Sequence, residues 1–346
     1  LVGHGAAGKT TLAESLLAAT GTITSRGTVE KGNTTCDFDP LEKEVGHSLQ
    51  SAIVSMQWGG VTLHLIDTPG YPDFAGPAIA ALAGVDTALI VVNAQTGIEL
   101  CTERMFQSAG ERGLCRMIVI NKIDADNTDL PALVNQIRDR FGKQCMLLDL
   151  PAHHGQEVVE LLGHHEGDSD FASVADAHRA LIDQIVEEDE TLLARYLEDG
   201  ADPNLTELHA PFEAALRAGH LIPTLFVSAR TGAGIPQLLD ALAQLAPNPA
   251  EGNPPPFYKG ETGQAQESFA AQPDETLHVL AHVFKVVVDP FIGKMGVFRV
   301  HQGTVVRDQQ LFVGSGKRPF KVAHLYRLQG KDYVEVQRLV PGDIGA

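Results

Sequence analysis

The first two thirds of the chain contain several short apolar runs, and each run stops at a polar or glycine-rich segment. Residues 61–66, 117–120 and 225–227 are runs of this kind. Apolar runs of this length predict strands, and residues 117–120 have the composition of a buried strand in a parallel sheet. Residues 11–19 instead favour a helix, directly after a glycine-rich turn. The pattern therefore predicts an α/β region in which polar segments follow the ends of strands.

The pattern changes after residue 247. A stretch rich in proline and glycine continues to about residue 273. Beyond it, residues 278–288 and 296–303 have the composition of strands, with a turn expected at 289–294. Repeated short strands with such turns predict a β-barrel. We therefore expect three regions, which are an α/β domain over residues 1–247, a linker over 248–274 and an all-β barrel domain over 275–346.

Composition and charge narrow the class of protein. The 346 residues are 44% hydrophobic and 20% charged, which is ordinary for a globular protein, and the formal net charge is −18. That charge argues against the chain wrapping nucleic acid by itself. The four cysteines lack metal-ligand spacing and indicate a reducing cytoplasm. No apolar run approaches the roughly 20 residues of a membrane span, so we expect no membrane partner, and we expect a monomer.

The two ends of the sequence lie within segments that resemble strands. Only two residues precede the glycine-rich turn, whereas a strand has about five residues. The last residues, 341–346, are also strand-like and carry no polar tail. We therefore expect a fragment of a longer protein.

The most specific chemical signal is the glycine-rich turn itself. Residues 3–10 match the phosphate-binding pattern G-x-x-x-x-G-K-[ST]. Its backbone N–H groups can point at phosphate oxygens, Lys9 can neutralise the outer phosphates, and the Thr10 hydroxyl is placed for Mg²⁺. The helix that follows adds its N-terminal dipole to the site. The predicted phosphate-binding residues are Gly3, His4, Gly5, Ala6, Ala7, Gly8, Lys9, Thr10 and Thr11.

Three further segments at strand ends predict the rest of a GTP site. Asp124 closes the N-K-x-D pattern, and its carboxylate can accept two hydrogen bonds from guanine that adenine cannot donate. Asp67 is expected to hold Mg²⁺ through water, and the Gly70 N–H to contact the γ-phosphate. Ligand groups at the carboxyl ends of strands are typical of doubly wound α/β sheets. The predicted residues in these segments are Asp67, Thr68, Pro69, Gly70, Tyr71, Asn121, Lys122, Ile123, Asp124, Ser228 and Ala229.

With these motifs the chain resembles the translational GTPases, and within them elongation factor G. Residues 37–49 resemble the first switch of that family. The resemblance puts Ser48 in the place of a Mg²⁺-binding threonine, so the predicted Mg²⁺ ligands are Thr10, Ser48 and Asp67. The interval between Asp124 and Ser228 far exceeds the roughly 30 residues of a βαβ unit. The surplus, at about residues 149–208, resembles the α+β subdomain inserted in elongation factor G. Acidic residues 187–190 are interpreted as the solvated face of one helix over 174–197.

The resemblance also implies an activity and partners. It implies a P-loop doubly wound GTPase domain with an inserted α+β subdomain, followed by an all-β barrel domain. It implies GTP hydrolysis to GDP and phosphate with Mg²⁺, stimulated by the ribosome. The partners would then be ribosomal RNA and ribosomal proteins, among them the ribosomal stalk, in translocation or in ribosome disassembly and recycling.

Several residues around the expected γ-phosphate depart from the family pattern. Tyr71 stands where a histidine usually orients the attacking water. Gly5 and His47 replace the two members of a hydrophobic gate, and Ala6 replaces an aspartate that helps to hold a monovalent cation. Tyr71, Gly5 and Ala6 also resemble a group of elongation factor G-like bacterial paralogues. We predict a rebuilt catalytic end that can lower the rate of hydrolysis, with the catalytic residues Tyr71, His47, Lys9 and Gly70.

Three alternatives remain open from the sequence. The first is a nucleotide-gated ribosome-binding protein with little GTPase activity, which the departures favour. The second is a GTPase of the tetracycline ribosomal-protection type, which has a similar domain order. The third is a metabolic P-loop kinase, which the N-K-x-D pattern disfavours.

Overall fold

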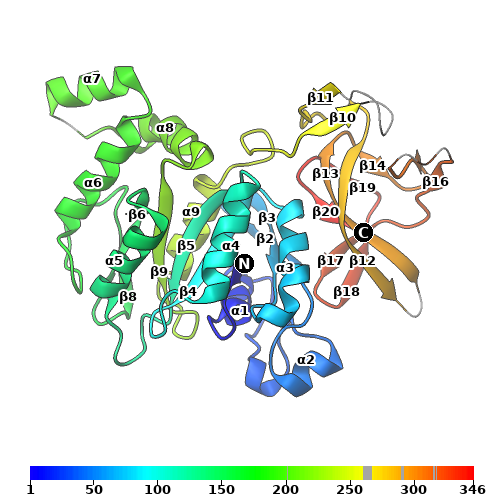
Figure 1. The fold of residues 1–346 in the computed structure, drawn as a ribbon, viewed down its shortest axis with the longest axis horizontal. Helices are drawn as coiled ribbons and strands as arrows, with labels where there is room; N and C mark the ends of the chain where they lie inside the picture. Colours follow the sequence, from blue (N-terminus) through cyan, green and yellow to red (C-terminus); the bar gives the residue numbers. More distant parts are fainter. Residues whose placement is uncertain (201, 260–266, 290–291, 315, 317) are drawn as a thin grey trace.

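The computed structural model describes residues 1–200, 202–259, 267–289, 292–314, 316 and 318–346. An α/β region occupies the left and centre of Figure 1, and a β region in orange and red lies on its right. A yellow segment without helices joins the two regions. Within the described residues, no helix has the length and apolar character needed to cross a membrane.

A five-stranded parallel sheet forms the centre of the α/β region. Its strands, in spatial order, are β1 (Val2–Gly3), β4 (Thr87–Asn93), β5 (Cys115–Asn121), β9 (Ile222–Val227) and β6 (Cys145–Leu147). Residues 117–120 of β5 are fully buried. Continuous apolar runs suit strands that are covered on both faces. The predicted α/β class and the buried strand at 117–120 are therefore confirmed.

Helices surround this sheet (Figure 1). The predicted helix at residues 11–19 lies within α1, which begins at Lys9. The helices of the region are α1 (Lys9–Ala19), α2 (Pro40–Val45), α3 (Ala75–Ala81), α4 (Leu100–Glu111), α5 (Leu130–Phe141) and α9 (Ile235–Gln244), with the 3-10 helices η1 (Val29–Lys31), η2 (Pro72–Phe74) and η3 (Leu82–Gly84).

An antiparallel hairpin lies beside β1. It consists of β2 (Ala52–Trp58) and β3 (Val61–Asp67), so the strand predicted at 61–66 is present. The backbone nitrogen of Leu1 donates to the Ile66 carbonyl at 2.7 Å. This contact places the end of β3 beside β1, close to the predicted phosphate and Mg²⁺ residues.

The segment between β6 and β9 folds as a hairpin followed by helices, at the left of Figure 1. Its elements are β7 (Asp149–Ala152), β8 (Glu157–Glu160), α6 (Val174–Val186), α7 (Glu190–Asp199) and α8 (Leu205–Ala218). The predicted limits of the inserted subdomain, 149–208, stay a prediction.

The prediction of one helix over 174–197 is wrong. The helical segment breaks after Val186, and α7 begins again at Glu190. The Asp189 carboxylate accepts hydrogen bonds from the N–H groups of Thr191 and Leu192, each at 2.9 Å, and so caps the new helix. The acidic run therefore lies at a helix junction and does not form the outer face of one long helix.

The β region follows a short hairpin in the linker. The strands predicted at 278–288 and 296–303 correspond to β12 and β13, while Pro290 and Phe291 of the predicted turn lie outside the described residues. The strands are β10 (Phe257–Lys259), β11 (Glu267–Phe269), β12 (Leu280–Asp289), β13 (Gly293–Gln302), β14 (Val305–Val306), β15 (Gln310–Leu311), β16 (Phe320–Lys321), β17 (Tyr326–Gln329), β18 (Asp332–Glu335), β19 (Arg338–Leu339) and β20 (Ile344–Gly345).

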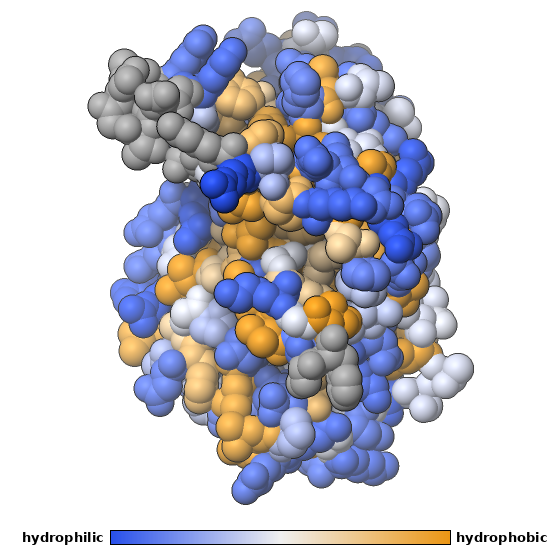
Figure 2. Space-filling view, turned by 90° about the vertical axis from the view of Figure 1, so that its right-hand side faces the viewer, coloured by the Kyte–Doolittle hydropathy of each residue, from blue (hydrophilic) through white to orange (hydrophobic). Residues whose placement is uncertain are grey.

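These strands pair in several small sheets, and within the described residues their buried side chains form two clusters. β12, β13 and β20 form a three-stranded sheet, and the other described strands pair in twos. Val300, Val305, Leu325 and Leu339 come from different segments and form one buried cluster. The region is all-β, as predicted. On the face seen in Figure 2, apolar residues are interspersed with polar ones, which is ordinary for a globular surface.

The β region packs on the β2–β3 hairpin. Ile53 and Ile66 of the hairpin share a buried cluster with Phe284 and Val297 of the β region. Buried Arg299 also pairs with Asp86 at 2.6 Å. Apolar burial against the hairpin and the ion pair of Arg299 with the half-buried Asp86, just before β4, hold the β region against the α/β region.

Candidate functional site

The glycine-rich turn forms a loop around Lys9. The Lys9 Nζ donates to the carbonyls of Gly3 at 3.2 Å and His4 at 2.7 Å. Gly8 has φ +88° and precedes the first turn of α1. A Cβ atom there would collide with the amide of Asn121, so glycine is required both by the backbone and by the neighbour. Burial lowers the pKa of Lys9, while the nearby Asp67 carboxylate opposes this shift.

The three predicted Mg²⁺ ligands lie together at the end of this loop. The Thr10 hydroxyl donates to Asp67 Oδ2 at 2.7 Å, and its oxygen lies 3.2 Å from Ser48 Oγ. The other Asp67 oxygen, Oδ1, is buried and has no hydrogen-bond partner among the described residues. Burial raises the pKa of Asp67, against the hydrogen bond from Thr10. A buried carboxylate oxygen without a partner, next to two hydroxyls, fits a hard cation such as Mg²⁺.

Asp37 is a neighbour of this site that sequence reasoning did not single out. It is 3% exposed, and both of its carboxylate oxygens are buried. Burial raises the pKa of Asp37 to about 6, an interaction with the Ser48 side chain opposes this shift, and the charges of Asp67 and Glu42 add to it. A lone aspartate at the start of the first switch carries no motif, and only the fold brings it near Asp67.

The segment predicted as the first switch, residues 37–49, is folded around a second buried carboxylate. Glu42 is 3% exposed, and its carboxylate accepts from the backbone N–H groups of Asp39, Leu49 and Gln50. The same residue completes the capping box of α2 with Asp39. Glu42 thereby fixes the two ends of the segment that carries His47 and Ser48.

Tyr71, His47 and Gly5 pack as one unit. The rings of Tyr71 and His47 have centroids 4.6 Å apart, and the Phe74 ring lies 5.8 Å from that of His47. A Cβ atom on Gly5 would lie 2.8 Å from Cζ of Tyr71, closer than side chains normally approach. The tyrosine ring therefore occupies the space that a side chain at position 5 would fill. The departures at Gly5 and Tyr71 are sterically linked, which the sequence alone did not reveal.

Gly70 lies directly against the glycine-rich loop. A Cβ atom on Gly70 would collide with Lys9 Nζ and with the backbone of Gly5. Thr68, on the same segment, donates its hydroxyl to the Leu1 carbonyl at 2.7 Å. The segment after β3 therefore meets the segment after β1, as the strand-end rule predicts.

Asn121 connects the expected base site to the phosphate loop. Its Nδ2 donates to the Ala7 carbonyl at 3.0 Å, and its Oδ1 accepts from the N–H groups of Lys122 at 2.8 Å and Ala229 at 3.0 Å. One buried amide thus holds three of the predicted motifs in register.

Asp124 is held by two side chains. Ser228 Oγ donates to Oδ1 at 2.6 Å, and Arg230 Nε donates to Oδ2 at 2.7 Å. Burial acts to raise the pKa of Asp124, but the hydrogen bonds from Ser228 and Arg230 outweigh it and hold the pKa below its usual value. The carboxylate is therefore ionised and fixed in direction, which suits its predicted contacts with two guanine donors. The Arg230 side chain was not among the predicted site residues.

Residues 1–248 match the family model of the elongation factor Tu GTP binding domain, and residues 278–346 match elongation factor G domain 2. The chain belongs to the translational GTPase family. Membership of this family implies that the chain binds a guanine nucleotide.

Relatives of this translational GTPase are elongation factor G-like. A protein of that name from Mycobacterium tuberculosis is 33% identical over 328 residues, which cover 90% of this chain and 45% of the relative. One from Thermotoga maritima is 32% identical over 358 residues, covering 99% of this chain and 51% of the relative. A crystal structure from Thermus thermophilus has a TM-score of 0.83 at 31% identity, covering 99% of this chain and 51% of that one. The chain spans about half the length of these relatives.

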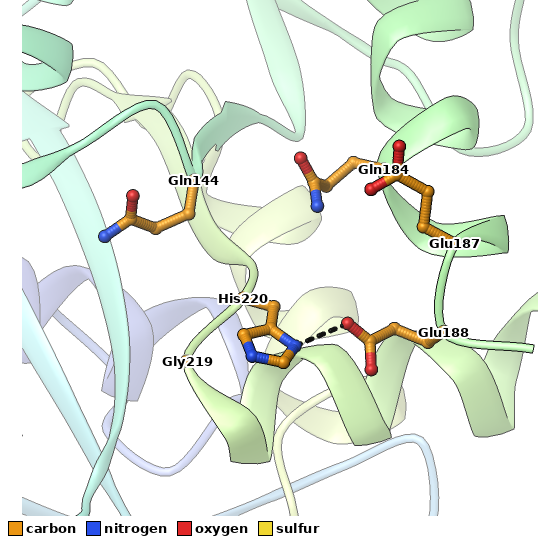
Figure 3. Close-up of a pocket in the computed structure, with 6 residues that line it drawn as sticks. All are labelled: Gln144, Gln184, Glu187, Glu188, Gly219 and His220. Carbon is orange, nitrogen blue, oxygen red and sulfur yellow. Dashed lines mark hydrogen bonds and ion pairs between the residues drawn. The ribbon is translucent and has the colours of Figure 1, made fainter.

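A separate open depression of the translational GTPase lies between the end of α6 and the end of α8. Figure 3 shows Glu188 pointing toward His220, with an ion-pair distance of 2.7 Å. None of the residues that line the depression belongs to the predicted nucleotide site, and an exposed ion pair contributes little to stability.

Proposed function

We propose that this translational GTPase hydrolyses GTP to GDP and phosphate and acts on the ribosome as a nucleotide-dependent switch similar to elongation factor G. The observation that carries the proposal is the convergence of the motifs after β1, β3, β5 and β9, with Thr10 bonded to Asp67 and adjacent to Ser48. We further propose a cytoplasmic monomer whose partners are ribosomal RNA and ribosomal proteins. Translocation and ribosome recycling are both compatible with this switch.

The proposed roles of the residues follow from their positions. Lys9 and the N-terminus of α1 neutralise the outer phosphates. Thr10, Ser48 and Asp67 would hold Mg²⁺, which would neutralise negative charge on the phosphates. Ser48 on the first switch and Gly70 on the segment after β3 become ordered by the γ-phosphate side of the nucleotide and are released after hydrolysis.

Tyr71 and His47 are the proposed catalytic side chains. Their rings are in contact, and Gly5 leaves the space that the Tyr71 ring fills. A phenol can hydrogen-bond the attacking water, although it cannot supply the positive charge of an imidazolium. Phosphoryl transfer depends mostly on positioning and charge stabilisation, so a slower but functional site is expected.

The test is multiple-turnover GTP hydrolysis by the intact protein, with and without 70S ribosomes. We expect ribosomes to stimulate the native protein, and Tyr71→Phe to lower the stimulated rate by about 100-fold, the low end for removing one positioned hydrogen-bonding group at a reacting centre. Tyr71→Phe keeps the ring against Gly5 and removes only the hydroxyl. An unchanged rate in Tyr71→Phe would contradict a role for that hydroxyl.

The rival function is a ribosome-binding switch with negligible hydrolysis, which Tyr71, Gly5 and Ala6 favour. The same assay separates it from the leading proposal. Tight GTP binding without turnover, and turnover restored in Tyr71→His, would establish the rival.

A further inference from the structure

Arg26, in the loop between α1 and η1, contacts the segment that follows β9. Its Nη1 donates to the Ala229 carbonyl at 2.6 Å and to Ser15 Oγ at 3.0 Å, and its Nη2 donates to the Arg230 carbonyl at 2.7 Å. Ser15 on α1 also donates to the Ala229 carbonyl, at 2.5 Å. One guanidinium thus binds two consecutive carbonyls of a segment far away in the sequence.

That segment is the part of the site expected to face the oxygen of guanine. Ser228 and Arg230 orient the Asp124 carboxylate, and the Ala229 N–H is held by Asn121. Arg26 bonds the same three-residue segment through the carbonyls of Ala229 and Arg230. The guanidinium therefore fixes the backbone of the segment without using its N–H groups.

Arg26 is also tied to the first switch through its neighbour. The Gly27 N–H donates to Glu14 Oε2 at 2.9 Å, and the Thr35 N–H donates to Glu14 Oε1. Glu14 lies on α1 and is 1% exposed, so its carboxylate is a fixed anchor for both ends of the loop over 27–35. Asp37 follows Thr35 by two residues. The loop that begins at Arg26 therefore ends beside the expected Mg²⁺ site.

We propose that Arg26 is a positioning residue for the guanine base: it holds residues 228–230 in the conformation that binds the base oxygen and thereby sets the rate of nucleotide release. The inference rests on the proposed guanine nucleotide site. Arg26 acts through the backbone of Ala229 and Arg230 and does not touch the nucleotide itself. Arg26 directly precedes the loop that Glu14 anchors at Gly27 and Thr35, so release of the base and movement of that loop are coupled.

The test measures dissociation of GDP and of 6-thioguanosine diphosphate from the intact protein. Sulfur in place of the base oxygen weakens the acceptor that faces residues 228–230 and keeps both donors that face Asp124. We expect Arg26→Ala to speed GDP release by about 10-fold, the loss expected for one charge-assisted hydrogen bond. Release of 6-thioguanosine diphosphate, already fast from the native protein, changes little. Arg26→Lys, which can reach one carbonyl, gives an intermediate rate.

Arg140→Ala is the matched control. Arg140 is an exposed arginine that bonds Glu103 between α5 and α4, away from the base site. The Arg140→Ala variant is expected to release both nucleotides at the native rates.

Equal acceleration of the release of both nucleotides by Arg26→Ala would mean a general structural effect and would overturn the inference. A native rate of GDP release from the Arg26→Ala variant would also overturn it. If the native protein binds neither nucleotide, both the proposed function and the inference that rests on it are contradicted. If Arg26→Ala does not fold, an Arg26→Lys variant that releases GDP at the native rate also overturns the inference.

Discussion

Replacing Asp124 with asparagine is expected to weaken binding of GTP and GDP by about 100-fold to 10,000-fold, because two charge-assisted hydrogen bonds to guanine are lost at roughly 1.5–3 kcal/mol each. The change keeps the size of the side chain. It leaves one acceptor and places an amide donor against a base donor. Titration with a fluorescent guanine nucleotide measures the effect.

The same variant should bind xanthine nucleotides better than the native protein does. Xanthine carries an oxygen where guanine carries its exocyclic amine, so the Asn amide can donate to it. Asp126→Asn is the control, because Asp126 is a carboxylate on the same loop that lies outside the N-K-x-D pattern. Loss of both guanine and xanthine binding with the fold intact would contradict the assigned role of Asp124.

Replacing Asp67 with asparagine is expected to remove the Mg²⁺ dependence of nucleotide binding and to lower turnover by about 100-fold, the order expected when one element of charge stabilisation is removed. Asparagine retains the volume of the side chain and an oxygen for the Thr10 hydroxyl, which now donates to Asp67 at 2.7 Å. What is lost is the negative charge at the buried oxygen that has no partner among the described residues. Nucleotide affinity measured with Mg²⁺ and with a chelator tests this directly.

The stability of the Asp67→Asn variant separates loss of function from unfolding. Burial raises the pKa of Asp67 in the folded chain, so the charged form destabilises the fold at neutral pH. A neutral asparagine should leave the free energy of unfolding unchanged or raise it. Asp73→Asn, at an exposed position on η2, is the control. If chelation of Mg²⁺ lowers the nucleotide affinity of the Asp67→Asn variant as strongly as that of the native protein, the Mg²⁺ assignment is refuted.

The parts of the site that were predictable are those where local chemistry alone decides the residue. A tight turn that exposes N–H groups needs Gly8, a phosphate needs Lys9, and guanine needs a carboxylate such as Asp124. Parallel strands end at one edge of the sheet, so these segments meet once the strand order is right. The α/β sheet and the all-β region followed from the change in hydrophobic pattern near residue 247.

The contacts that were not predictable depend on the positions of other elements. The need for glycine at position 5 is explained only by the Tyr71 ring that lies over Gly5. The closeness of Asp37 to Asp67 results only from the fold of the chain. Arg26 bonds a segment far away in the sequence, with no pattern that links the two. The break between α6 and α7 was missed because a single capping residue, Asp189, competes with a continuous helical pattern.

The most direct test of a nucleotide-dependent ribosome switch is association of the intact protein with 70S ribosomes. Sedimentation would compare the protein bound to a non-hydrolysable GTP analogue with the protein bound to GDP. We expect association with the analogue and release with GDP, because the γ-phosphate side orders the segments carrying Ser48 and Gly70. Equal association in both states, or none in either, would contradict the proposed function.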